Sequence, residues 1–245
     1  MAIVQDLISG LPDGEAVRSV LVGAHCTAVC SRRCGLASTV SGGKPHSHDR
    51  VRNAGRLHHM NARELAEYAF SANPLEASIG IAAINSLLEV DERNTIEINA
   101  LDILMRRGQG RDIALVGHFP FVPLLRESVG RLWVIELDPA EGDYPAEAAA
   151  DLIPQADIVA LTGSALINHT LDTLLSLCRP GSQVMILGPS TPLSPVLFSY
   201  GARILCGAVV IDEAAVLHSV GQGAAFHQVE GVRLLSMTAS AQDLI

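Results

Sequence analysis

Glycines, prolines, small polar residues, one histidine and one phenylalanine lie at the ends of the apolar runs in the second half of the sequence. They are Gly117, His118, Phe119 and Pro120 after the first run, Thr162, Gly163, Ser164 and Asn168 after the third, and Gly188, Pro189, Ser190 and Thr191 after the fourth. Free backbone N–H groups beside small hydroxyl side chains suit a carboxylate, a phosphate or another oxyanion. The alternative is N-capping of the helices that follow, which Ser and Thr perform in many proteins. Two such loops facing one cleft favour a site for a small anionic ligand.

Two carboxylates end the second apolar run, at Glu136 and Asp138. An acidic residue at this position of a dinucleotide-binding fold holds the ribose hydroxyls, so either carboxylate could bind an adenosyl ligand. The alternative is a carboxylate solvated in a loop. The glycine fingerprint G-x-G-x-x-G is absent after the first run, where Gly117 precedes bulky Phe119 and a proline. The sequence therefore argues against ordinary NAD binding.

Cysteines near the N-terminus are candidate ligands for a soft metal ion. Cys30 and Cys34 flank a predicted turn, and thiolates select soft metals. Cys26 and Cys30 lie on one predicted strand, about 13 Å apart at 3.3 Å per residue, so they cannot hold one ion together. Cys26, Cys178 and Cys206 fit the core better. An odd count of five cysteines, without an export signal, predicts reduced thiols.

Histidines give a further set of candidate metal ligands, nine in all. His118 ends the first apolar run and is the metal-ligand candidate at the predicted ligand site. His46 and His48, in a polar loop, project to one side with a spacing that can share a transition metal. A surface loop with two histidines and no fixed third ligand is more often unliganded.

Continuous apolar runs separated by helical stretches predict the elements that position these residues. The runs cover residues 112–119, 131–138, 157–163, 183–188 and 203–212. Runs without alternation indicate strands that are buried on both faces, as in parallel sheets covered by helices. We therefore expect a doubly wound, Rossmann-like α/β domain over residues 109–245, with its ligand beyond the carboxyl ends of the strands.

The first half of the sequence has a different pattern of apolar and polar residues, which predicts a smaller α+β domain over residues 1–108. One strand is expected over residues 17–31 and a second over 35–40, paired as a hairpin. Asn61 with Glu64, and Asn73 with Pro74, are helix start signals. They predict helices over residues 62–70 and 75–90, and a third is expected over 96–107.

Composition narrows the function classes. The net charge of −9 argues against a nucleic-acid partner, which needs a basic face. The uncharged run over residues 180–202 contains Pro189, Pro192 and Pro195 in its interior, so no membrane span is expected. No signal peptide is recognisable, and we expect a cytoplasmic protein. A mean hydropathy of +0.31 with 4% aromatic residues favours a homodimer with an apolar interface.

Five segments, in order and spacing, resemble the family of putative heavy-metal chelation proteins: residues 115–121, 136–139, 157–172, 184–202 and 206–212. The resemblance covers about residues 111–223, and a looser pattern of hairpin and helices covers about residues 6–88. It implies an N-terminal domain similar to the enolase N-terminal fold and a Rossmann-like C-terminal domain. It also implies a ligand site between the domains at His118, Phe119, Pro120, Thr162, Gly163, Asn168, Gly188, Pro189 and Ser190.

Three functions are compatible with these observations. The favoured one is a protein that handles a metal chelate or metal cofactor, with a transition metal as the expected cofactor. The alternative is an enzyme that uses S-adenosylmethionine or another adenosyl ligand in the Rossmann-like domain. The third is a binding or assembly module without chemistry. The sequence identifies no reaction, so it leaves open whether the protein is an enzyme.

Overall fold

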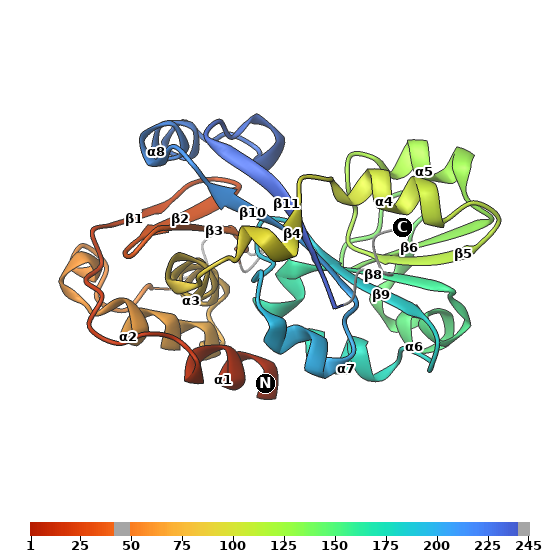
Figure 1. Cartoon of the computed structure of the whole chain (residues 1–245), viewed down its shortest axis with the longest axis horizontal. Coiled ribbons are helices and arrows are strands. Elements are labelled where there is room, and N and C mark those ends of the chain that lie inside the picture. The colour runs from red at the N-terminus through yellow and green to blue at the C-terminus, as the bar shows by residue number, and fades with distance from the viewer. Residues whose placement is uncertain (42–49, 240–245) are drawn as a thin grey trace.

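Two sheets and their covering helices make up the structure, a computed structural model that describes residues 1–41 and 50–239 (Figure 1). The smaller sheet has the order β1-β2-β3, and the larger has the order β4-β11-β10-β9-β8-β5-β6-β7. The strands of the smaller sheet are β1 (Ser19–Val22), β2 (Cys26–Cys30) and β3 (Cys34–Ser38). Those of the larger sheet are β4 (Thr95–Ile96), β5 (Asp112–Val116), β6 (Arg131–Glu136), β7 (Tyr144–Pro145), β8 (Ile158–Thr162), β9 (Gln183–Leu187), β10 (Ile204–Val210) and β11 (Val232–Thr238).

Most of the helices are short. The α-helices are α1 (Ala2–Ser9), α2 (Ala62–Ala66), α3 (Pro74–Leu87), α4 (Ala100–Arg107), α5 (Val122–Ser128), α6 (Ala149–Leu152), α7 (Leu171–Ser176) and α8 (Glu213–Gly221). The 3₁₀ turns are η1 (Leu57–His59), η2 (Glu67–Phe70), η3 (Glu92–Asn94), η4 (Ala146–Ala148), η5 (Ile153–Gln155), η6 (Gly163–Leu166), η7 (Pro195–Tyr200) and η8 (Phe226–Gln228). Within the described residues, no helix is long and apolar enough to cross a membrane.

The single strand predicted over residues 17–31 is wrong, because the chain reverses between β1 and β2. The two strands pair antiparallel, with Val22 opposite Thr27. Gly23 lies at the reversal, where a Cβ would be 2.4 Å from the carbonyl oxygen of Val220. A side chain there would collide with the end of α8, so the turn needs this glycine. The predicted hairpin is confirmed as the β2–β3 pair, with Cys30 opposite Cys34.

Helix caps read from the sequence are present in the structure. The Asn61 side chain accepts from the N–H of Arg63, and Glu64 reaches back to the N–H of Asn61. Asn73 caps α3 through the N–H of Leu75, with Pro74 in the first turn. The helix predicted over residues 96–107 begins later than expected. Thr95 and Ile96 pair with β11 instead, and α4 starts after its cap.

The second half of the chain forms the expected Rossmann-like α/β sheet. Strands β10, β9, β8, β5, β6 and β7 run parallel, and β11 adds an antiparallel strand that the sequence reading missed. Side chains alternate between two apolar layers: Ala114, Val159 and Ile186 on one face, and Leu115, Ala160 and Leu187 on the other. Both faces are buried, which explains the continuous apolar runs.

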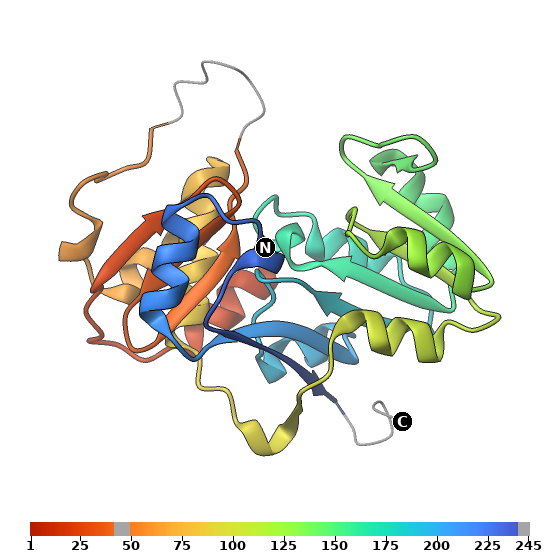
Figure 2. The same ribbon diagram turned by 90° about the horizontal axis from the view of Figure 1, so that it is seen from above.

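The two units share one core, and the C-terminal half of the chain completes the N-terminal unit. Helix α8 packs on β1 and β2, and β10 contacts β3 (Figures 1 and 2). Val216 and Val220 of α8 join Cys30 and Leu36 of the hairpin in one buried cluster. The domain limits of 1–108 and 109–245 stay a prediction, and the pairing of β4 with β11 favours a boundary before residue 95. The likeness of the first unit to the enolase N-terminal fold also stays a prediction.

Candidate functional site

The carboxyl ends of β5, β8 and β9 bring several predicted site residues together. Gly117 has a φ of +108°, and a Cβ there would be 3.0 Å from both the Phe119 ring and the Cβ of Thr162. Gly188 has the same φ, and its Cβ would be 3.9 Å from the other edge of the Phe119 ring. That ring stacks on Phe121, with 5.1 Å between the centroids. Because β5 and β8 flank the point where the strand order reverses, this is the expected ligand edge of the sheet.

The loops after β8 and β9 touch through their backbones. A Cβ at Gly163 would be 2.7 Å from both the N and the Oγ1 of Thr191. Thr191 itself is buried, and among the described residues its hydroxyl has no hydrogen-bond partner. The two loops that the sequence analysis placed at one cleft are therefore in contact. The Thr191 hydroxyl lies inside this contact.

Ser190 joins the loop after β9 to the N-terminal unit. Its buried hydroxyl accepts a hydrogen bond of 2.8 Å from the backbone N–H of Ser38, at the end of β3. A second contact nearby joins the same two units, between Nε2 of His169 and the carbonyl oxygen of Ala69, at 2.8 Å. The strand-end loops therefore lie against the N-terminal unit, and Ser190 holds that arrangement.

Replacing Ser190 by Ala is expected to lower the free energy of unfolding by about 1–3 kcal/mol, because it leaves the N–H of Ser38 without its partner. Urea unfolding at neutral pH measures this loss. The matched control is Ser199→Ala, which removes an exposed hydroxyl in η7 and should change stability by less than about 0.5 kcal/mol. Equal stability of the two variants would mean that the Ser190 hydroxyl is not needed for the fold.

The hydroxyl and amide groups after β8 cap local structure. Oγ1 of Thr162 accepts from the N–H of Ser164, and Oδ1 of Asn168 accepts from both the N–H and the hydroxyl of Thr170. These bonds fit the N-capping interpretation that we weighed against ligand binding. The side chain of Pro189 has no polar atom, so it can contribute only apolar contact.

His118 is held at the end of β5 by a buried carboxylate. Its Nδ1 lies 2.7 Å from Oδ2 of Asp143, whose side chain is fully buried. Arg126 donates to the other oxygen of Asp143 at 3.0 Å, and also to the carbonyl oxygen of Gly142. Asp143 is thus an acceptor on both sides, so Nδ1 of His118 must donate. The other ring nitrogen, Nε2, has no hydrogen-bond partner within the described residues.

Asp143 and Arg126 are the functional candidates that the sequence reading missed. Asp143 follows His118 by 25 positions, in the loop between β6 and β7. A lone Asp after a glycine reads as a turn residue, and only the fold brings it to the imidazole.

Glu136 supports the backbone around His118. Its Oε1 accepts from the N–H of His118 and its Oε2 from the N–H of Leu137, each at 2.8 Å. Both oxygens are used within the chain, which weighs against Glu136 as the ribose ligand of an adenosyl compound. Asp138 is exposed, and its oxygens make no hydrogen bond within the part of the chain that the structure describes.

Cys30 and Cys34 form a close pair elsewhere in the fold. Their Sγ atoms are 2.8 Å apart, and the side chains are buried across the hairpin. Ser38, which contacts Ser190, is four residues further along β3, about 13 Å from Cys34. The two cysteines therefore meet each other, at the other end of β3 from the contact between Ser38 and Ser190.

A metal ion held by protein ligands alone does not fit the strand-end site. No group of three or more His, Cys, Asp or Glu side chains within residues 1–41 and 50–239 has the geometry to hold an ion. His118 offers one nitrogen, and its carboxylate neighbours are already bonded to the chain. The paired loop histidines, His46 and His48, lie outside the described residues.

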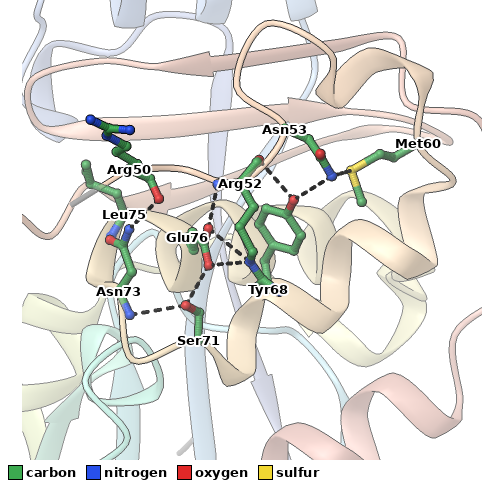
Figure 3. A network of polar contacts seen from close by, with 9 residues as sticks. All are labelled: Arg50, Arg52, Asn53, Met60, Tyr68, Ser71, Asn73, Leu75 and Glu76. Carbon is green, nitrogen blue, oxygen red and sulfur yellow. Dashed lines mark hydrogen bonds and ion pairs between the residues drawn. The ribbon is translucent and has the colours of Figure 1, made fainter. Parts of the chain in front are cut away.

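Polar contacts fix the chain before and after residues 42–49 to the first turns of α3, and Figure 3 shows those around residues 50–53. Ser78 accepts from the N–H of Val40, and Asn73 donates to the carbonyl oxygen of Arg50. Buried Glu76 accepts from both the N–H and the side chain of Arg52. Residues 40 and 50–52 are therefore held at one helix end.

Two family models match the chain, both described as putative heavy-metal chelation: DUF364 over residues 99–238 and DUF4213 over residues 4–88. An uncharacterized protein of Methanocaldococcus jannaschii is 28% identical over 161 residues, which cover 62% of this chain and 61% of that protein. A crystal structure of a DUF364 protein of unknown function from Desulfitobacterium hafniense is similar with a TM-score of 0.84 and 29% identity, over 97% of this chain and 98% of that one. Another, from Pyrococcus horikoshii, has a TM-score of 0.80 and 20% identity over the same shares, and shows the fold alone.

Proposed function

Because the chain belongs to the DUF364 family, described as putative heavy-metal chelation, we propose that it binds a metal ion already held by a small anionic chelator. The site is the carboxyl edge of β5, β8 and β9. The observation that carries this proposal is the imidazole of His118, which is oriented by buried Asp143 and has a free Nε2.

His118 has the surroundings typical of a metal-binding histidine. Such histidines donate their second ring N–H to a carboxylate, which fixes the tautomer and makes the ligating nitrogen more basic. Asp143 fills this role, and Arg126 holds Asp143 in place. The side chain of His118 is 44% exposed, so its Nε2 is open to a ligand from solvent.

One protein nitrogen is not enough to hold a heavy metal, so the remaining donors must come with the ion. A chelator that wraps the metal and leaves at least one coordination position open would meet this need, and His118 would fill one such position. The metal is then cargo and not a resident cofactor. Gly117 and Gly188 leave space beside the Phe119 ring, and we propose that these residues and Pro120 form the wall against the organic part of the chelate. The predicted homodimer stays a prediction beside this proposal.

Nickel(II) nitrilotriacetate is a suitable probe, compared by titration calorimetry with free nickel(II). We expect the wild type to bind one chelate per chain, and His118→Ala to lose that binding. Asp143→Asn should weaken it by about 10–100-fold, as removal of an outer-shell partner does at metal sites. All proteins in the comparison, including the reference that stands for the wild type, carry His46→Asn and His48→Asn, so that this pair contributes nothing to the differences.

His227→Ala is the matched control, because it removes an exposed histidine whose side chain has no hydrogen bond within residues 1–41 and 50–239. It should bind the chelate as the wild type does. Unchanged binding in His118→Ala, or equal affinity for the chelate and free nickel(II), would contradict the proposal.

A further inference from the structure

The buried thiols of Cys30 and Cys34 lie together, away from the strand-end site, and have no role in the proposed function. They face each other across the β2–β3 pair, with 0% and 7% of their surfaces exposed. Their neighbours in the core cluster are apolar and include Ala28, Leu36 and Val216. We propose that Cys30 and Cys34 form a second, separate site for a soft, two-coordinate d10 metal ion such as copper(I).

The donor set selects this class of metal. Thiolates prefer soft ions, and within the described residues no third His, Cys, Asp or Glu completes a cluster around the pair. Zinc(II) needs four ligands in a structural site, so two sulfurs in an apolar cluster suit it poorly. A metal ion that is stable with a coordination number of two and with sulfur ligands fits this pair.

Geometry leaves room for the ion. With metal–sulfur bonds of about 2.3 Å, two sulfurs on opposite sides of an ion are about 4.6 Å apart, so the 2.8 Å pair must open. Rotation about the Cα–Cβ bonds can supply this movement. A cavity of about 20 Å³ lies on the Cys34 side of the pair, where Asn85 and Thr191 also line it but Cys30 does not, and it is enough for one water-sized body.

One cation and one anion lie against the pair: Arg18 and the Glu213 carboxylate, which is hydrogen-bonded to Cys30. Binding of copper(I) would release one proton from each thiol and leave a complex of charge −1, with no change of oxidation state. Arg18 runs beside the cysteines, held by Glu213 of α8 in a two-pronged pair at 2.6 and 2.7 Å and by the carbonyl oxygen of Ser31. The hydrogen bond to Cys30 and burial raise the pKa of the Cys34 thiol.

Competition with bicinchoninate for copper(I), without oxygen and on the full chain, tests this site. We expect one copper(I) per chain, with release of two protons. Cys30→Ser and Cys34→Ser should each lose more affinity than the about 10–100-fold that an outer-shell partner is worth. Cys206→Ser and His118→Ala should keep the site, because Cys206 lies in another core cluster and His118 in the strand-end site. Retention in His118→Ala separates this proposal from the previous one.

X-ray absorption at the copper edge of the wild type gives a readout that needs no variant. Two sulfur neighbours and no nitrogen are expected. Three or more ligands, equal affinity for zinc(II), or a Cys30–Cys34 disulfide that excludes copper under reducing conditions would overturn the proposal.

Discussion

Gly80→Ala is expected to lower the free energy of unfolding by about 3 kcal/mol or more, because α3 crosses the turn before it at backbone contact. A Cβ at Gly80 would be 2.0 Å from the N of Ala69 and 2.6 Å from the carbonyl carbon of Tyr68. Neither atom belongs to a flexible side chain, so η2 and α3 would have to move apart. At about 2–4 °C per kcal/mol for a chain of this size, the melting temperature should fall by roughly 6–12 °C.

Gly221→Ala is the matched control, because Gly221, like Gly80, lies in a helix, at the end of α8. Its Cβ would be 3.6 Å from the Cδ2 of Leu21, an ordinary contact. Thermal unfolding of this variant should match or slightly exceed the wild type, because Ala favours a helix over Gly. A Gly80→Ala protein as stable as Gly221→Ala would show that α3 and η2 do not approach so closely.

Glu76→Gln is the second large effect, with an expected loss of about 2–4 kcal/mol at neutral pH. The carboxylate is 3% exposed and accepts from Ser71 at 2.6 Å and from the side chain of Arg52 at 2.9 Å (Figure 3). An amide carries no charge and turns an N–H toward one of these donors. The exposed Glu67→Gln is the control, with little expected change.

This loss should depend on pH. Burial of Glu76 raises its pKa, but the hydrogen bonds from Ser71 and Arg52 outweigh burial and leave the pKa lowered. The carboxylate therefore contributes stability that is fully present above the unfolded pKa of about 4.3 and is lost as the pH falls through the lowered folded value. The stability gap between the wild type and Glu76→Gln, measured by urea unfolding, should narrow with acid below about pH 4.3. A constant gap across that range would contradict the assignment.

Local signals in the sequence predicted much of the fold. The caps at Asn61 and Asn73 are fixed by residues within three positions, so they could be read directly. The apolar runs predicted five strands because burial on both faces leaves a continuous pattern. The turn at Gly23 was missed because its cause is α8, almost 200 residues further along the chain.

The candidate site was predicted only in outline, for a related reason. The glycines after β5, β8 and β9 are recognisable because strand ends are where ligands bind. What each polar group does there depends on its partner, as with Glu136, whose oxygens hold the N–H groups of His118 and Leu137. The Asp143 contact to His118 crosses a loop whose path the local pattern does not determine.

The position of α8 has a consequence for how the protein is made. Residues 19–38 leave the ribosome long before residues 213–221, yet the hairpin buries Cys30 and Leu36 under Val216 and Val220. Chains usually fold N-terminal domains first during synthesis, and here the first unit must wait with one apolar face open until almost the whole chain has emerged.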